Sequence, residues 1–189
     1  MSMQRVTITA NRFNKLGAPI RIPVPASISS TMTKKTLSEV EAWSPVLKRH
    51  AEEDASWDWA QILREHESLR RARLNVYDYA ILRCQRRTQA LMIMEIANHR
   101  NRADKPMVYV EYLAIAPWNR PGIQQPREFV GCGSALIEHS VERSISLGYG
   151  GLVGLHTLPG ARSFYMGIGF KDLGADSQEG GLHYLQLND

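Results

Sequence analysis

A short glycine turn in front of a helical pattern is the first feature of this 189-residue sequence that could do chemistry. The stretch VGCGSALIEHSVERSISLG, residues 130–148, places Gly131 and Gly133 one residue apart just before an amphipathic pattern. The first N–H groups of a helix lack partners within the helix and lie at the positive end of its dipole. Glycine lets an anion approach these groups closely. The turn therefore predicts a phosphate site or, as the structural alternative, a tight connection between a strand and a helix.

The glycine spacing disfavours the two common nucleotide-binding loops. GCGSAL lacks the Lys-Ser/Thr pair that completes a P-loop, and no third glycine follows at the spacing of dinucleotide-binding folds. A phosphate group of another kind of ligand is the remaining candidate.

Two titratable side chains stand in or at the end of apolar strand patterns. Glu111 interrupts MVYVEYLAIA, residues 107–116, on the same side of the expected strand as Tyr109. A buried carboxylate is costly unless it is paired or faces a cleft, so Glu111 invites a functional interpretation, with a salt bridge or an edge position as the alternatives. His156 ends GGLVGLHTL, and its unperturbed pKa suits proton transfer at neutral pH. A hydrogen-bonded structural histidine is the alternative there.

The secondary structure predicted to position these residues differs from one part of the chain to the next. The first 35 residues contain LGAPIRIPVPAS, whose prolines predict an irregular or edge-like segment. Residues 36–73 are rich in helix formers, with Thr36 and Glu39 spaced as a capping box. Pro45 and the DAS near residue 55 are expected to split this region into two or three helices.

Strand patterns dominate after residue 74. Residues 74–84 and 90–97 predict a hairpin, and the apolar run 107–116 predicts a buried central strand. The order then continues with a helix, a strand at 150–158, a helix within 159–170 and a closing strand at 182–187. This alternation predicts an α/β layered fold.

Composition narrows the class of protein further. With 43% hydrophobic residues in 189, the chain suits one domain with a single core. A net charge of +4 permits nucleic-acid binding without requiring it. Cys84 and Cys132 form neither a disulfide framework nor a metal-ligand cluster, so we expect no metal and a reducing, cytoplasmic location. No apolar run approaches the length of a membrane span.

The order of three stretches resembles the core of the GNAT superfamily, the acyl-CoA-dependent N-acetyltransferases. The stretches are VEYLAIAPWNR, VGCGSALIEHSVERSISLGYGGLVGLHTL and ARSFYMGIGF. The resemblance covers residues 74–170 and is strongest from Val108 onward. It implies a GNAT-like mixed central sheet flanked by helices in residues 36–189, preceded by the irregular or edge segment 1–35.

The resemblance also implies acetyl-CoA as the cofactor. The end of the central strand would present main-chain groups to the pantetheine arm, and the glycine turn would hold the pyrophosphate. At the corresponding positions stand Leu113, Ala114, Ile115, Val130, Gly131, Cys132, Gly133 and Ser134.

Several positions depart from the family pattern. The segment between Pro117 and Gly131 is much longer than usual, and Glu128 stands where glutamine or arginine is preferred. Compensation of the phosphate charge would then come from Arg120 or Arg127. Leu158 stands where an asparagine is common.

The resemblance assigns the catalytic roles. Tyr165 matches a tyrosine that protonates the departing thiolate of coenzyme A, a suitable donor because its ordinary pKa of ~10 lies near that of a thiol, ~8.5. A core tyrosine is the alternative. Glu111 or His156 would act as the general base on the acceptor ammonium, directly or through water. Cys132 is interpreted as a small filler in preference to a redox-sensitive thiol.

The resulting hypothesis is direct acetyl transfer from acetyl-CoA to an amine in a ternary complex. The acceptor is expected to be a small-molecule or peptide amine, and a homodimer is compatible with the sequence. One alternative is a non-catalytic module that binds acyl-CoA or a partner, which the altered loop favours. Another is a toxin-like acetyltransferase acting on aminoacyl-tRNA, supported only by the basic charge.

Overall fold

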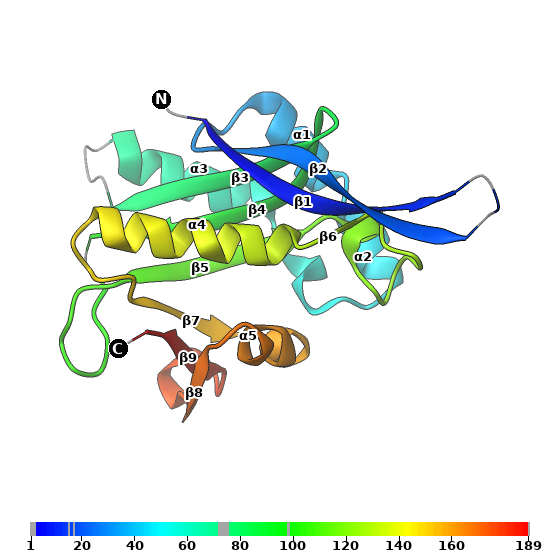
Figure 1. The fold of residues 1–189 in the computed structure, drawn as a ribbon. Helices are drawn as coiled ribbons and strands as arrows, with labels where there is room; N and C mark the ends of the chain where they lie inside the picture. Colours follow the sequence, from blue (N-terminus) through cyan, green and yellow to red (C-terminus); the bar gives the residue numbers. More distant parts are fainter. Residues whose placement is uncertain (1–2, 15, 17, 72–75, 98, 189) are drawn as a thin grey trace. The chain divides into compact units, whose positions relative to one another are not determined.

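A mixed β-sheet organises the computed structural model, which describes residues 3–14, 16, 18–71, 76–97 and 99–188 (Figure 1). The described strands are β1 (Gln4–Phe13), β2 (Pro19–Ser29), β3 (Tyr77–Cys84), β4 (Arg87–Glu95), β5 (Val108–Ile115), β6 (Phe129–Val130), β7 (Val153–Thr157), β8 (Lys171–Ala175) and β9 (His183–Leu187). Their order in the sheet is β6-β1-β2-β3-β4-β5-β7-β9-β8. The pairing of β5 with β7 is parallel, whereas β7 with β9 and β8 with β9 are antiparallel.

Helices and 3-10 turns accompany the strands. They are α1 (Lys34–Glu41), α2 (Ser44–Arg49), η1 (Glu53–Ser56), α3 (Trp59–Arg71), η2 (Pro117–Asn119), α4 (Cys132–Ser146), η3 (Pro159–Ala161), α5 (Arg162–Gly167) and η4 (Ser177–Glu179). The predicted mixed sheet flanked by helices, the β3–β4 hairpin, the central strand β5 and the division of the helical region are confirmed.

The described residues divide into two compact units, each built from separate stretches of the chain. The first unit takes its residues from 1–65, 79–92 and 113–136, and the second from 66–78, 93–112 and 137–189. Several elements, including β5 and α4, contribute residues to both units.

In the first unit, β1 and β2 form a long antiparallel hairpin (Figure 1). Of the two expectations for residues 1–35, an irregular or an edge-like segment, the irregular one is therefore wrong for these strands. Pro19, Pro23 and Pro25 alternate along β2 opposite Phe13, Thr9 and Thr7 of β1. The backbone N–H groups of alternate residues in a strand point to the same side. The three prolines therefore stand at positions of β2 that donate no backbone hydrogen bond to β1. β3 pairs with β2 only over Ser27–Ser29, which leaves the proline-containing part on an edge.

The α1 helix begins three residues earlier than the capping-box pattern suggested. Thr33 is the N-cap, and its side chain accepts a hydrogen bond from the Thr36 N–H at 3.0 Å. Glu39 instead accepts bonds from the Thr88 N–H and the Arg83 guanidinium, both at 3.0 Å. Burial alone would raise the pKa of Glu39, but these bonds outweigh it and lower the pKa. A charged contact thus ties α1 to the β3–β4 hairpin.

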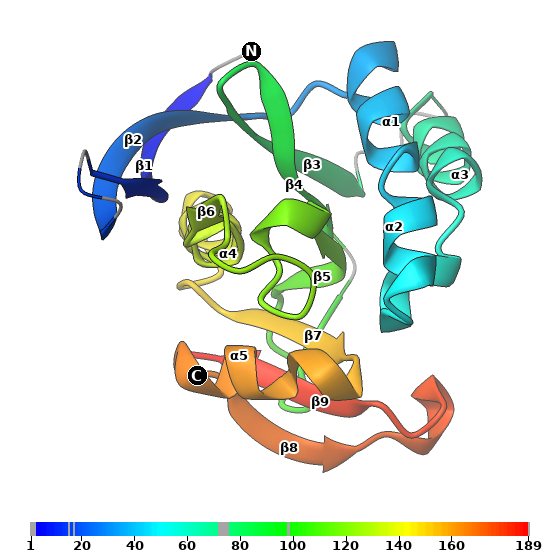
Figure 2. The same ribbon diagram turned by 90° about the vertical axis from the view of Figure 1, so that its right-hand side faces the viewer.

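In the second unit, β7, β9 and β8 lie side by side with α5 next to them (Figure 2). The parallel register of β5 and β7 runs from Val108 opposite Val153 to Val110 opposite Leu155. β7 continues past this register to Thr157 in its pairing with β9. The sequence did not predict β8, a short strand with an irregular register against β9.

Candidate functional site

The glycine turn lies between β6 and α4 in the first unit. β6 pairs with β1, with Val130 opposite Thr9, and the chain turns at Gly131 with φ of 90° before α4 begins at Cys132. Glycine adopts this left-handed conformation without strain. A Cβ atom built on Gly131 would meet no atom within 4 Å. The turn is therefore open on the side where a side chain would stand.

The peptide nitrogens at the start of α4 have no acceptor within the described part of the chain. The Ala135 N–H donates to the Gly131 carbonyl at 2.9 Å and is the first helical donor. No hydrogen bond between described residues is donated by the backbone N–H of Gly131, Gly133 or Ser134. The helix start thus has the donors that an anion needs.

A buried amide pair anchors the long segment that precedes the turn. Asn119 accepts from the Phe129 N–H at 2.9 Å and donates to the Gln89 Oε1 at 3.0 Å. The Trp118 indole N–H donates to the same Gln89 oxygen at 2.7 Å. The segment that departs from the family pattern is therefore fixed to β4. Sequence reasoning missed Asn119 and Gln89, because nothing in the sequence places them opposite each other.

The two arginines expected to compensate phosphate charge have different surroundings. Arg120 donates to both carboxylate oxygens of Asp54, at 2.8 and 2.6 Å, and to Glu52 at 2.9 Å. Its Nε also donates to the Ile115 carbonyl at 2.8 Å. These bonds give Arg120 a structural role. Arg127 makes no ion pair with a described residue, so it is the better placed of the two for a ligand.

The Cys132 thiol is buried behind the turn. Its residue is 3% exposed, and the Asn119 Nδ2 lies 3.7 Å from its sulfur. Burial raises the pKa of Cys132 to about 12, so the reactive thiolate is scarce at neutral pH. This favours the filler interpretation over the redox-sensitive thiol.

In the second unit, Glu111 is paired with a buried histidine. Its Oε2 lies 3.1 Å from the His66 Nε2, and its side chain remains 31% exposed. The His66 ring packs edge-on against Tyr77, with ring centroids 4.5 Å apart. Glu111 is thus a half-exposed carboxylate in an aromatic setting. No signal in the α3 sequence singles out His66 as its partner.

His156 has both ring nitrogens in hydrogen bonds. Its Nδ1 lies 2.7 Å from the Tyr109 hydroxyl, and its Nε2 lies 3.3 Å from the Asp176 Oδ2. Its side chain is only 10% exposed. His156 is therefore held between Tyr109 and Asp176 and has little surface left for direct contact with a substrate. The sequence placed Tyr109 on the face of Glu111 but gave no sign of Asp176.

Tyr165 lies in α5 among aromatic rings. The residue is 6% exposed, and its ring centroid lies 5.0 Å from that of Phe164 and 5.5 Å from that of Phe170. Burial raises the pKa of Tyr165, so the phenol keeps its proton at neutral pH. A protonated phenol is the form that a general acid requires.

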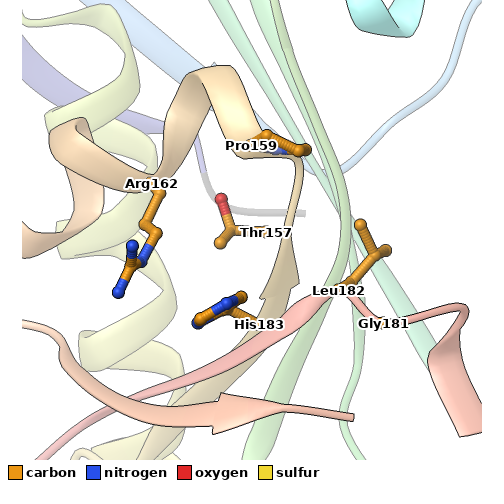
Figure 3. A pocket seen from close by; sticks show the side chains of 6 residues that line it. All are labelled: Thr157, Pro159, Arg162, Gly181, Leu182 and His183. Carbon is orange, nitrogen blue, oxygen red and sulfur yellow. The ribbon is translucent and has the colours of Figure 1, made fainter. Parts of the chain in front are cut away.

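A pocket of about 320 Å³ lies at the end of β7 in the second unit (Figure 3). Its lining comprises Thr157, Pro159, Arg162, Gly181, Leu182 and His183. Arg162 and His183 both bind the Asp172 carboxylate, at 2.6 Å from Nε and 2.9 Å from Nδ1. The Gly174 N–H, the His183 ring and the Arg162 guanidinium hold the pKa of Asp172 at about 2. The Arg162 guanidinium of this pocket is therefore already balanced by a carboxylate.

The predicted residues thus fall into two groups. The first unit contains the end of β5 at Leu113, Ala114 and Ile115, together with the glycine turn and Arg127. The second unit contains Glu111, His156 and Tyr165. Within it, Tyr109 is linked to two of these residues. Its hydroxyl lies within hydrogen-bond distance of His156. Burial raises the pKa of Tyr109 most, the Glu179 charge raises it further, and the Glu111 charge makes a smaller contribution in the same direction.

No helix in the described ranges is both long and apolar enough to cross a bilayer. The described residues also contain no group of three or more His, Cys, Asp or Glu side chains arranged to hold a metal ion.

Three solved structures with the same fold are acetyltransferases. The PaiA N-acetyltransferase of Thermoplasma acidophilum, in complex with coenzyme A, matches 87% of this chain and 99% of its own at 12% identity, with a TM-score of 0.57. The N-acetyltransferase YlbP of Bacillus subtilis, also in complex with coenzyme A, matches 87% and 97% at 16% identity, with a TM-score of 0.54. A GNAT-family acetyltransferase of Staphylococcus aureus matches 86% and 98% at 12% identity, with a TM-score of 0.59.

These structural neighbours are GNAT-family N-acetyltransferases, and the chain has their fold. The fold that the sequence resemblance implied is therefore confirmed. No family model and no curated protein matches the sequence itself.

Proposed function

We propose that this protein is an acyl-CoA-dependent N-acetyltransferase, which transfers the acetyl group of acetyl-CoA directly to an amine in a ternary complex. The observation that carries the proposal is the open turn at Gly131, whose neighbouring peptide nitrogens have no acceptor among the described residues. Solved structures with this fold hold coenzyme A, which supports the same ligand here.

On the cofactor side, the peptide nitrogens of residues 130–134 would bind the pyrophosphate. A helix start favours such a dianionic group by both hydrogen bonding and its dipole. Arg127 would add a cationic side chain, since it makes no ion pair with a described residue. The last residues of β5, Leu113 to Ile115, would orient the pantetheine arm through their main chain.

On the acceptor side, Glu111 would attract the ammonium form of the acceptor. Loss of one proton, to Glu111 or to His156, frees the amine lone pair to attack the thioester carbonyl. Tyr165 would then protonate the departing thiolate, because burial keeps its phenol in the protonated form. Orientation of the two reactants in one complex would supply much of the acceleration.

Calorimetry and thiol release together test the proposal. Acetyl-CoA should bind the purified chain, and a Gly131→Val variant should bind it at least tenfold more weakly, since a β-branched residue at φ of 90° is strained. A panel of benzylamine, cadaverine, glycinamide and Nα-acetyl-lysine then probes thiol release. Binding without release across a broad amine panel would favour the non-catalytic module, and absence of binding at millimolar acetyl-CoA would overturn both.

A further inference from the structure

A chain of three side chains crosses the second unit from β5 to the turn before β9. The Tyr109 hydroxyl lies 2.7 Å from the His156 Nδ1, and the His156 Nε2 lies 3.3 Å from the Asp176 Oδ2. This carboxylate–imidazole–phenol arrangement follows the geometry by which a carboxylate orients a histidine toward a hydroxyl group.

The direction of proton donation along this chain follows from Asp176. The Gln178 N–H, and less strongly the His156 ring, lower the pKa of Asp176, so its carboxylate is ionised and can only accept. The His156 Nε2 therefore carries a hydrogen and donates it to Asp176. The Nδ1 lone pair is left to accept the hydroxyl hydrogen of Tyr109.

Both ends of the chain are held in place. The Asp176 Oδ1 accepts from the Gln178 N–H at 2.9 Å, and the Asp176 carbonyl accepts from the Gly181 N–H at 2.8 Å. The Tyr109 ring stacks on His99, with centroids 3.9 Å apart and an angle of 11° between planes. The His99 Nδ1 lies 3.2 Å from Glu95, which fixes that ring in turn.

Tyr109 is suited to pass a proton on, and unsuited to act as an ionised base. Burial, with a further contribution from the Glu179 charge, raises the pKa of Tyr109 well above its ordinary value. A tyrosinate would therefore be scarce at neutral pH. A hydroxyl group can nevertheless accept one proton while it donates another, and remains neutral throughout.

We propose that Tyr109, His156 and Asp176 form a proton relay that receives the proton released by the acceptor amine, an inference that rests on the proposed acetyl transfer. The ammonium donates its proton to the Tyr109 oxygen while the Tyr109 proton passes to the His156 Nδ1. The products are a neutral amine, a neutral tyrosine and an imidazolium paired with the Asp176 carboxylate. His156 then returns its proton to solvent.

Glu111 has a separate role in this scheme. It lies two residues after Tyr109 on β5, and its negative charge contributes to the raised pKa of Tyr109. A carboxylate at that place holds the ammonium by charge, while the relay takes the proton. Tyr109, His156 and Asp176 are thus the proton path, and Glu111 positions the acceptor.

Other titratable groups surround Tyr109 and contribute to the pH dependence of kcat. They are Glu95 at the end of β4, His99 after β4, Glu111 on β5, Glu179 in η4, Tyr184 on β9 and Arg102, whose guanidinium lies over the Tyr184 ring. The matched control comes from this set. The Tyr184 ring lies 5.2 Å from His156, but its hydroxyl contacts the Met107 sulfur at 3.4 Å and not the relay.

The test compares Tyr109→Phe with Tyr184→Phe in the full chain, using the best acceptor of the amine panel. Tyr109→Phe should lower kcat about 100-fold at pH 7, in the range of a general-base contribution, with the KM for acetyl-CoA unchanged. The deficit should shrink as the pH approaches ~10, where a primary amine loses its proton unaided. Tyr184→Phe should stay within about threefold of the natural chain.

Two results would overturn the relay. One is a Tyr109→Phe variant whose kcat equals that of the natural chain, or whose kcat is lowered by the same factor at pH 7 and at pH 10, as a purely structural defect would predict. The other is a nitrogen NMR spectrum showing the hydrogen of His156 on Nδ1, which needs no activity. A natural chain that acetylates no amine overturns the proposed function itself, whereas an active chain with an unaffected Tyr109→Phe variant overturns the relay alone.

Discussion

The two units of this protein offer a ligand different kinds of atoms. In the first unit, the groups left for a ligand are peptide nitrogens and the Arg127 side chain, while Asn119 is bonded to Gln89 and Arg120 to Asp54. In the second unit, the groups with chemistry are side chains, linked in the pairs Glu111–His66 and Tyr109–His156. Substitutions in the first unit should therefore change stability or cofactor affinity, and substitutions in the second should change the rate.

The largest expected effect is on stability, in the first unit. Arg120→Met removes the partner of Asp54, which is 6% exposed, and leaves a carboxylate buried without its cation. Loss of one member of a buried pair costs about 3–5 kcal/mol in the free energy of unfolding. Urea denaturation measures this. Lys35→Met is the control, since its pair with Glu39 is long and exposed, and a similar loss there would contradict the distinction.

The second prediction concerns the rate, in the second unit. Tyr165→Phe should lower kcat about 100-fold, because no phenol remains to protonate the thiolate, while calorimetry finds the acetyl-CoA affinity unchanged. Phe164→Leu is the control for packing, since it alters the ring beside Tyr165 and leaves the hydroxyl. Equal losses in the two variants would assign Tyr165 to the core.

The third prediction tests the main chain of the first unit. Gly131→Ala should weaken acetyl-CoA binding about tenfold, because an L-residue at φ of 90° costs roughly 1–2 kcal/mol or shifts the peptide nitrogens. The added methyl group meets no protein atom, so steric exclusion within the chain is not the cause. Gly148→Ala, at φ of 81° after α4, carries the same strain and should leave the affinity unchanged.

The smallest expected effect comes from a single, partly exposed charge, that of Arg127. Arg127→Gln should weaken acetyl-CoA binding about threefold at low salt, within the ~1 kcal/mol of a partly exposed charge, and less at high salt. Calorimetry at two salt concentrations measures both values. A salt-independent loss would mean that Arg127 holds the turn through packing, which would weaken the contrast between the two units.

The glycine turn and its helix were predictable because their backbone conformations restrict which residues can stand at these positions. An open left-handed position calls for glycine, and the helix after it calls for a 3.6-residue pattern. The strands β3, β4, β5, β7 and β9 were found for the same reason, since a buried strand needs an unbroken or alternating apolar run. Short β8, KDLGA, has no such run and was missed.

The partners of the functional side chains were not predictable in this way. His66 reaches Glu111 across 45 positions, and Asp172 meets His183 because β8 pairs with β9. The four-residue spacing of Ile137, Val141 and Ile145 predicts one buried face of α4, and this is wrong for the last of the three. Ile145 is 60% exposed, whereas Ser144 is buried and donates to the Leu152 carbonyl at 2.8 Å. A hydrogen bond to a neighbouring loop can therefore bury a serine where a pattern expects an aliphatic residue.

The prolines of β2 also limit how copies of this chain could assemble. Of the four odd-numbered residues from Pro19 to Pro25, only Arg21 has an amide hydrogen to offer at the outer rim of the hairpin. A further strand laid along that rim would find carbonyl oxygens but almost no donors, so a continuous sheet across two molecules, or an amyloid-like stack, is disfavoured there. A dimer joined along this rim of β2 must therefore use its side chains.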